Sequence, residues 1–229
     1  MARKHSGRAV RGSQHHLQNL INEYPKQYLD NLILSNSPSL SVYTKKSLEW
    51  RSPLACQNYC EYRDGDFLQA VGLFYMKSSL SEFWPRLGPS WDALATVAGN
   101  GDSHGVILLE AKSHFKELAG SGCGAKGNSL EKIKGSLSIV KHALGARGSA
   151  NWLGKYYQYA NHLAHLYWLD MEEVPAWLVF LYFMGDKEQG GPNTEAEWKY
   201  KLNEVRTELG LPAYHSLSDR IIDLFMPVS

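Results

Sequence analysis

A glycine-rich turn between two strand-like runs is the sequence feature that most constrains the fold of this chain. Residues 90–97 (SWDALATV) and 105–112 (GVILLEAK) are rich in residue types that favour extended structure. Between them, residues 99–103 (GNGDS) have the composition of a tight turn. This pattern predicts an antiparallel β-hairpin, and therefore a fold built on a sheet.

The hairpin would gather charged side chains on one of its faces. Side chains two residues apart in a strand share a face, so Glu110 and Lys112 point the same way. If the turn closes the hairpin, Val97 lies opposite Gly105. Counting outward from there, Asp92 lies opposite Glu110. Two carboxylates held this close repel each other unless a positive charge lies between them, and such hard oxygen ligands suit Mg²⁺ or Mn²⁺.

The Glu-x-Lys triplet occurs twice, and the second copy serves as an internal control. Glu197-Trp198-Lys199 follows a helix-start signal at residues 192–194, in a segment with apolar residues at helical spacing. Side chains two residues apart on a helix point in very different directions. The first copy alone lies in an apolar run of β character with an acid on the neighbouring strand, which is the context that a metal site needs.

The hairpin residues resemble the motif of the PD-(D/E)XK phosphodiesterase superfamily, mainly over residues 61–112. By this resemblance Asp92 is the metal-binding Asp, and Glu110 is the second acid. Lys112 is the catalytic lysine, and Trp91 stands where the motif has Pro. The resemblance implies an α/β fold, namely a restriction-endonuclease-like mixed β-sheet flanked by helices, with an extra N-terminal helical segment here.

The same resemblance nominates further site residues. Many members carry an acid on the helix before the hairpin, for which Glu61 is the candidate. Gln158 looks like a glutamine that the recombination-exonuclease branch carries on the helix after the hairpin. The backbone carbonyl of Ala111 would join the acids around the ion. The resemblance thus implies a Mg²⁺ or Mn²⁺ ion held by Asp92, Glu110, Ala111 and Glu61, with Asp92, Glu110, Lys112, Glu61 and Gln158 as catalytic residues.

Composition predicts one globular domain. With 229 residues, of which 44% are hydrophobic and 21% charged, the chain can bury one sizeable core. We expect a disordered basic tail at residues 1–14 and a single nuclease-like domain over residues 15–229, with its core at about residues 54–186. No signal-peptide pattern opens the chain, and the longest apolar run, residues 176–184, is far shorter than the ~20 residues of a membrane span. These features predict a cytoplasmic protein without membrane contact.

Charge is unevenly distributed, although 24 basic and 23 acidic residues give a formal net charge of only +1. A total this small does not by itself indicate a polyanion-binding protein. One basic group lies in the expected tail and fits a disordered terminus: Arg3, Lys4, Arg8 and Arg11. A second group follows the proposed site and fits either a solvated helix face or a phosphate-binding surface: Lys126, Lys132, Lys134, Lys141 and Arg147.

The rest of the chain predicts helices and one more strand. Residues 175–184 form a continuous apolar run, which is typical of a strand buried on both faces and central in its sheet. A Ser-rich stretch at residues 35–41 predicts a loop. Helical patterns occupy residues 15–34 with a break at Pro25, 53–80 with interruptions, 128–144, 151–169, 194–209 and 218–226. His162 and His165 share a helix face, where packing or hydrogen bonding is expected because no third metal ligand is evident nearby.

Three interpretations of function stay open. The resemblance favours a metal-dependent nuclease that hydrolyses DNA rather than RNA, and it is compatible with a homodimer because many restriction-like nucleases pair to cut two strands. A noncatalytic nucleic-acid-binding or assembly protein on the same fold would fit the near-neutral charge and the absence of a recognisable DNA-binding module. Alternatively, Glu110 and Lys112 form an exposed cross-strand pair, although the residues that share their face are mostly apolar: Leu94, Thr96, Val106 and Leu108.

Overall fold

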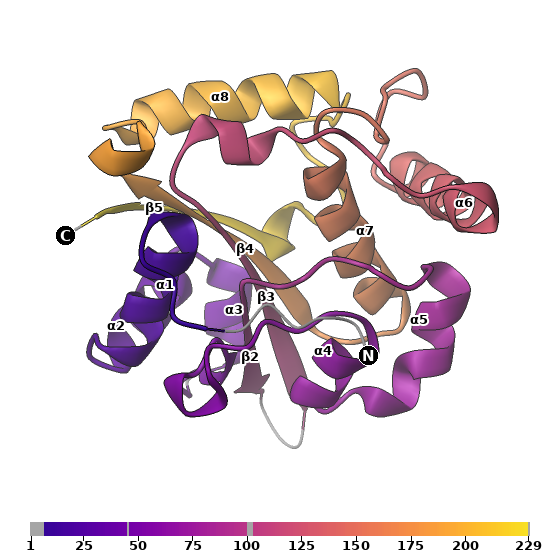
Figure 1. The fold of residues 1–229 in the computed structure, drawn as a ribbon. Helices are drawn as coiled ribbons and strands as arrows, with labels where there is room; N and C mark the ends of the chain where they lie inside the picture. The colour runs from indigo at the N-terminus through magenta and orange to yellow at the C-terminus, as the bar shows by residue number, and fades with distance from the viewer. Residues whose placement is uncertain (1–6, 45, 100–102, 229) are drawn as a thin grey trace.

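A mixed β-sheet forms the centre of the protein, in a computed structural model that describes residues 7–44, 46–99 and 103–228 (Figure 1). The described residues form five strands, which lie side by side in the order of the sequence. They are β1 (Glu49–Ser52), β2 (Ala93–Ala98), β3 (His104–Lys112), β4 (Ala176–Met184) and β5 (Ile221–Pro227). Strand β2 is antiparallel to both of its neighbours, β1 and β3, whereas β3, β4 and β5 run parallel.

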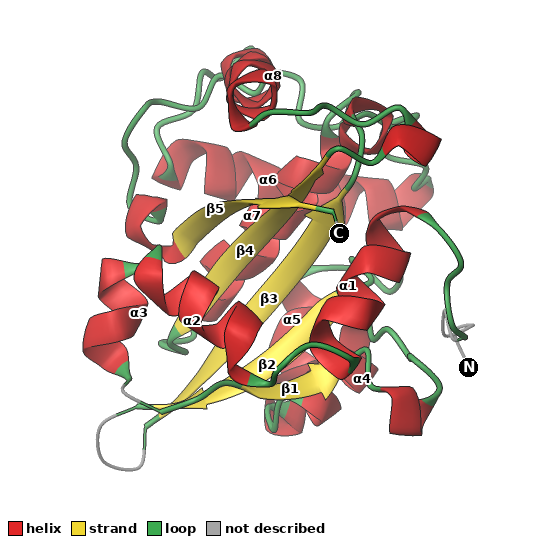
Figure 2. Cartoon of the chain, turned by 90° about the vertical axis from the view of Figure 1, so that its left-hand side faces the viewer, coloured by secondary structure: helices red, strands yellow, loops and turns green. Residues whose placement is uncertain are grey.

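Helices cover both faces of the sheet, which confirms the predicted α/β class. Figure 2 shows one group of helices in front of the sheet and another behind it. The first group comprises α1 (Gly12–Asn22), α2 (Gln27–Ser35) and α3 (Pro38–Tyr43). The second comprises α4 (Asp64–Ala70), α5 (Lys77–Phe83), α6 (Gly127–Ala143), α7 (Tyr157–Met171) and α8 (Glu195–Glu208).

The hairpin of β2 and β3 has the register that the sequence predicts. Val97 pairs with Gly105, and Ala93 pairs with Leu109. The turn is closed by a hydrogen bond of 2.9 Å from the Gly99 N–H to the Ser103 carbonyl, while residues 100–102 of the predicted turn lie outside the described residues. Because Asp92 comes directly before Ala93, the same count places it beside Glu110.

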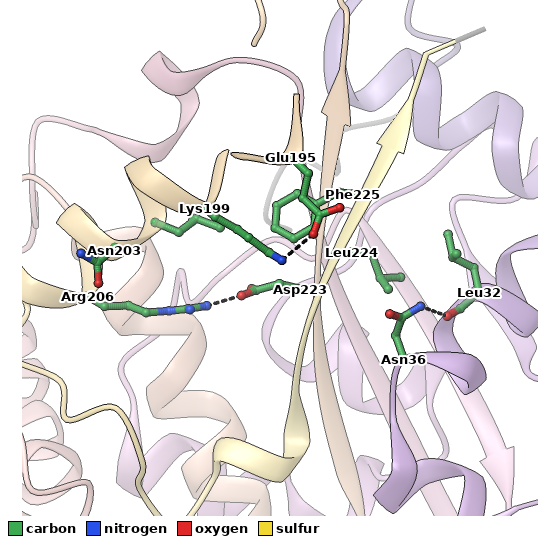
Figure 3. A pocket seen from close by; sticks show the side chains of 10 residues that line it. Leu32, Asn36, Glu195, Lys199, Asn203, Arg206, Asp223, Leu224 and Phe225 are labelled. Atoms are coloured by element: carbon green, nitrogen blue, oxygen red, sulfur yellow. Dashed lines mark hydrogen bonds and ion pairs between the residues drawn. The ribbon is translucent and has the colours of Figure 1, made fainter. Parts of the chain in front are cut away.

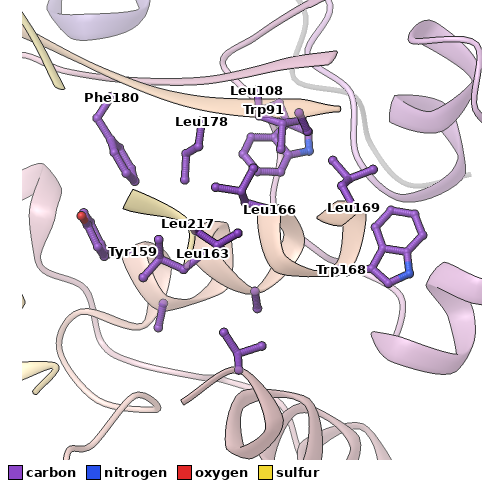
Figure 4. Packing of buried hydrophobic residues seen from close by; sticks show 14 of the residues in the cluster. Trp91, Leu108, Tyr159, Leu163, Leu166, Trp168, Leu169, Leu178, Phe180 and Leu217 are labelled. Carbon is purple, nitrogen blue, oxygen red and sulfur yellow. The ribbon is translucent and has the colours of Figure 1, made fainter. Parts of the chain in front are cut away.

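Two hydrophobic cores form because side chains alternate across the strands. Leu94 and Leu108 face the core that lies under α7, together with Leu178 and Phe180 of β4 (Figure 4). Their chain neighbours, such as Leu109, face the core under α1 and α2. Apolar residues on both faces of β3 and β4 fit strands in the interior of a sheet, and β4 is an interior strand, between β3 and β5.

Three predictions of local structure are wrong or incomplete. Residues 35–41 are not a loop throughout, because Ser37 caps the start of α3 by accepting a hydrogen bond of 3.3 Å from the Leu40 N–H. Residues 218–226 do not form the predicted helix beyond a single 3-10 turn at Ser218–Arg220, since from Ile221 onward they pair with β4, and burial alternates along the strand with period two. The strand β1 has no counterpart among the predicted elements.

Ordered structure begins within residues 1–14, where a disordered tail was predicted. Helix α1 begins at Gly12, and the break between α1 and α2 contains Pro25, as predicted. Arg8 donates a hydrogen bond to Glu23, the residue that follows α1, whereas Arg3 and Lys4 lie outside the described residues. Within the part of the chain that the structure describes, no helix is both long enough and apolar enough to cross a membrane.

Candidate active site

Glu110 and Lys112 project from the C-terminal end of β3 toward the helices of the α7 side. Glu110 is 1% exposed and Lys112 is 9% exposed, so the pair is not a solvated surface pair. The Lys112 ammonium donates to Oε1 of Glu110. A buried ion pair needs further hydrogen bonds to offset the loss of hydration, and several neighbouring side chains lie close enough to contribute.

Asp92 completes the predicted triad from the chain segment just before β2. Its Oδ2 atom accepts a hydrogen bond of 2.8 Å from the Ala111 N–H, which lies between the two charged residues of β3. The preceding residue, Trp91, is anchored by a bridge to Tyr62, with 3.0 Å from the Trp91 N–H to the Tyr62 carbonyl. The structure therefore brings together the three residues that carry the resemblance.

Gln158 and His162 approach Glu110 from the first turns of α7. Gln158 was predicted as a site residue on the helix after the hairpin. Its amide donates a hydrogen bond of 2.7 Å to Oε1 of Glu110. Nε2 of His162 lies 3.4 Å from the other oxygen, Oε2. Because residues four apart share a helix face, each of the two side chains faces one oxygen of the same carboxylate. The sequence assigned His162 to packing or hydrogen bonding, and its spacing from Gln158 was the signal for a second neighbour of Glu110.

Glu117 is a neighbour of the site that the sequence did not indicate. Its Oε2 atom accepts from the N–H groups of Ser113 and His114, at 2.5 and 3.2 Å, so it caps the short helix that follows β3. Its Oε1 atom accepts from Ser13 of α1 over 2.8 Å. The negative charge of Glu117 contributes to the raised pKa values of Asp92 and Glu110. A third acid thus lies within electrostatic reach of the triad.

Glu61 lies near the triad, but not on a helix. It belongs to the segment before α4, is buried, and accepts a hydrogen bond of 2.6 Å from the Gln14 amide. Because Tyr62 and Trp91 form an antiparallel bridge, the residues next to them, Glu61 and Asp92, lie opposite each other. The expectation that Glu61 sits on the helix before the hairpin is wrong, while its role as a metal ligand stays a prediction.

Burial and the neighbouring charges shift the pKa values of all three residues of the triad. Burial, followed by the charge of Glu110, raises the pKa of the Asp92 carboxyl to about 8, against the opposing effect of Lys112. Burial also raises the pKa of Glu110. Burial opposes the charge of Lys112, but the charges of Glu110 and Asp92 outweigh it and raise the pKa of the lysine. A cation that replaced a proton here would relieve the repulsion between the carboxylates.

The residues present fit a hard divalent ion in part. In residues 7–44, 46–99 and 103–228, no three His, Cys, Asp or Glu side chains form a metal-binding group. However, Mg²⁺ is commonly held by one or two carboxylates and keeps several waters. Oε2 of Glu110 is buried and has no hydrogen-bond partner among the described atoms, so this oxygen is available as a ligand. Asp92, Glu110, Glu61 and the Ala111 carbonyl remain the candidate ligands.

The imidazole of His162 is neutral. Burial, and to a smaller extent the charge of Lys112, lowers its pKa to about 3. The ring packs against Trp91, with 4.9 Å between the ring centroids. A neutral histidine retains one N–H, which can donate to a carboxylate oxygen. His162 can therefore hold Glu110 without adding a positive charge to the cluster.

The second Glu-x-Lys triplet lies on α8 and forms no such site, as predicted. Glu197 accepts from the N–H of Thr194 over 2.9 Å and caps the helix. Lys199 pairs with Glu195 instead, at 2.5 Å. The two charged residues of the triplet thus have separate partners.

A hollow of about 460 Å³ beside β5 is a weaker candidate for a site (Figure 3). Its charged residues form pairs among themselves, Lys199 with Glu195 and Arg206 with Asp223. It shares no lining residue with the cluster around Glu110. Its paired charges leave little to attract a charged ligand.

Comparison of the chain with models of protein families, with curated proteins and with solved structures finds no match.

Proposed function

We propose that this protein is a divalent-metal-dependent phosphodiesterase that hydrolyses nucleic acid, with DNA favoured over RNA. One observation carries the proposal: Asp92, Glu110 and Lys112 come together at the end of a β-hairpin, with Asp92 fixed by the Ala111 N–H. The mixed sheet with helices on both faces supports a restriction-endonuclease-like fold, which is part of the same proposal. Pairing of two copies to cut two strands remains compatible with it.

Lys112 has the role of a charge donor in the proposed reaction. Because its pKa is raised, it stays protonated and cannot serve as a general base. Its ammonium would contact a phosphate oxygen, or the attacking water, and stabilise the negative charge that develops as water adds to phosphorus and the ester oxygen leaves. A divalent ion held by Asp92 and Glu110 would supply Lewis-acid polarisation of the phosphate and a lower pKa for bound water.

The surrounding residues would position this chemistry. Gln158 and His162 orient the carboxylate of Glu110, which otherwise could turn away from the ion. Glu117 ties the end of β3 to α1 through Ser13, so the strand end is held in place. The nearly complete burial of Glu110 limits access of bulk water to this part of the site, which strengthens its electrostatic interactions.

A cleavage assay with a matched control tests the proposal. Labelled single-stranded and double-stranded DNA and RNA are incubated with the protein and Mg²⁺ or Mn²⁺. We expect cleavage by the wild type, loss of cleavage with Lys112→Gln, and full cleavage with Lys199→Gln, which makes the same change in the second triplet. Circular dichroism confirms that both variants fold. Equal cleavage by folded Lys112→Gln and wild type would overturn the proposal.

A noncatalytic binding or assembly protein on the same fold is the second candidate. It is favoured by the absence, among the described residues, of a three-residue metal-binding group. This candidate predicts nucleic-acid binding or self-association without cleavage on any of the four substrates. Mutation of Lys112 would then leave every measured activity unchanged.

A further inference from the structure

The segment between the two halves of the candidate site has a net positive charge, whereas the rest of the chain has a net negative charge. Residues 119–157, here called the basic excursion, contain six lysines and arginines and one glutamate, a net charge of +5. The rest of the chain has 18 basic and 22 acidic residues, a net charge of −4. The near-neutral total thus hides a strong separation of charge. A charge density of this kind attracts polyanions to one part of the surface.

The basic excursion begins and ends at the candidate active site. It follows the short helix that Glu117 caps, and the residue directly after it is Gln158, which donates a hydrogen bond to Glu110. Its two limbs run side by side, joined by hydrogen bonds of 2.9 Å from Gly120 to Lys155 and from Cys123 to Leu153. From there the chain crosses to α6 and returns to α7 (Figure 1). A strand of nucleic acid that leaves the triad along these limbs would reach α6.

Much of the positive charge on the basic excursion is fixed in position without being neutralised. The Lys141 ammonium donates to the carbonyls of Gly148 and Ala150, at 2.8 and 2.7 Å. Lys132 and Arg147 likewise donate to carbonyl oxygens, at 2.7 and 2.6 Å. A carbonyl restrains a cation but leaves its net charge in place. Exposed ion pairs form at Lys134 with Glu131 and at Lys155 with Glu208, and such pairs are weak.

A hollow of about 450 Å³ lies where the basic excursion turns back from α6. Lys134, Lys141 and His142 of α6 line one side, and Asn151 lines another. None of the residues that line it, all of them in the described part of the chain, is acidic. Lysines and an amide are the groups that contact phosphate and sugar oxygens in nucleic-acid complexes.

We propose that the basic excursion is a track for the phosphate backbone of a polynucleotide strand, running from the triad to the hollow on α6. The track rests on the proposed nuclease function, and it adds that the substrate extends well beyond the scissile phosphate. Because the contacts are to phosphate, binding depends on salt and tolerates any base sequence.

Salt-dependent binding tests the track. The affinity for a fluorescent single-stranded oligonucleotide is measured without divalent ions, so that no cleavage occurs, at several salt concentrations. The double variant Lys126→Gln/Lys134→Gln removes two exposed lysines of the basic excursion. Lys26→Gln/Lys46→Gln removes two exposed lysines outside it and is the matched control. Each phosphate contact contributes about 0.7 to the slope of log affinity against log salt for a single strand, so we expect the first variant to lower the slope by about 1.4.

The outcomes separate the track from the nuclease proposal. A lower slope in the first variant, with an unchanged slope in the control, supports the track even if no substrate is ever cleaved. Equal slopes in both variants, or a wild type that binds no oligonucleotide, overturn it. Cleavage by the wild type that depends on Lys112, together with equal slopes, would retain the nuclease and reject the track.

Discussion

Nε2 of the His162 imidazole lies 3.4 Å from Oε2 of the Glu110 carboxylate, and both groups are almost completely buried. Neither of these two atoms makes a hydrogen bond within the described part of the protein. A polar pair left in this state costs stability, because each group has lost its water without gaining a full partner. Such a cost is expected where a side chain is kept for function.

We predict that His162→Phe reduces cleavage about 10- to 100-fold, as is usual for residues that orient a metal ligand. The free energy of unfolding should stay the same or rise, because the variant removes two buried ring nitrogens that lack partners among the described residues. Cleavage rates and urea denaturation measure the two effects.

The control is His165→Phe, on the same helix. His165 is equally buried, but its Nδ1 lies 2.9 Å from the Asn161 carbonyl, and it packs against Trp84. This variant should lose stability and keep its cleavage rate. If both variants lose activity to the same extent, His162 has no special relation to Glu110.

Asp92 should make the metal-free protein less stable as pH rises. Its pKa is raised from about 3.8 to about 8, so between these values the folded chain binds more protons than the unfolded chain. The free energy of unfolding therefore falls as pH rises through this range. Asp92→Asn removes the charge. At about pH 8 we therefore expect the free energy of unfolding of this variant to exceed that of the wild type by about 1 to 2 kcal/mol. This difference is smaller than the full pKa shift implies, because Asp92 is partly exposed.

Chemical denaturation in the presence of a chelator, from about pH 5 to about pH 8, measures this dependence. The wild-type values should decline relative to those of Asp92→Asn as pH increases. Parallel curves for the two proteins would show that Asp92 titrates as an ordinary surface carboxyl.

Trp91 should be structural, although it precedes Asp92, which we propose as a metal ligand. Its ring is fully buried and packs against His162 and Phe67, and its Nε1 atom bonds no described group. Trp91→Phe should therefore lower the free energy of unfolding by about 1 to 2 kcal/mol and retain cleavage, whereas Trp91→Ala should lower it by about 3 to 5 kcal/mol. Denaturation midpoints and cleavage rates check both values. Loss of cleavage in a stable Trp91→Phe variant would assign the indole a role in the reaction.

The hairpin and its charged face were predictable because they depend on local signals. The turn composition sets the register, and the period of two sets which side chains share a face. Glu110, Lys112 and Asp92 follow from these two rules, and the structure confirms their arrangement. Gln158 was found through the resemblance, and its bond to Glu110 agrees with that placement.

Elements that depend on distant neighbours were not predictable. Residues 221–227 form a strand because the edge of β4 is available to pair with them, and the short sequence IIDLFMP also fits a helix. Glu117 approaches the triad only because the chain turns back after β3 and docks on Ser13 of α1. Contacts of this kind are made by the tertiary fold, and no local spacing encodes them.

Calorimetric titration with Mn²⁺ tests most directly whether Asp92 and Glu110 hold a divalent ion. We expect binding at millimolar affinity or tighter by the wild type and by Lys199→Gln, and loss of that binding in Asp92→Asn and Glu110→Gln. A folded wild type that binds no Mn²⁺, or undiminished binding by both of the carboxylate variants, would contradict it.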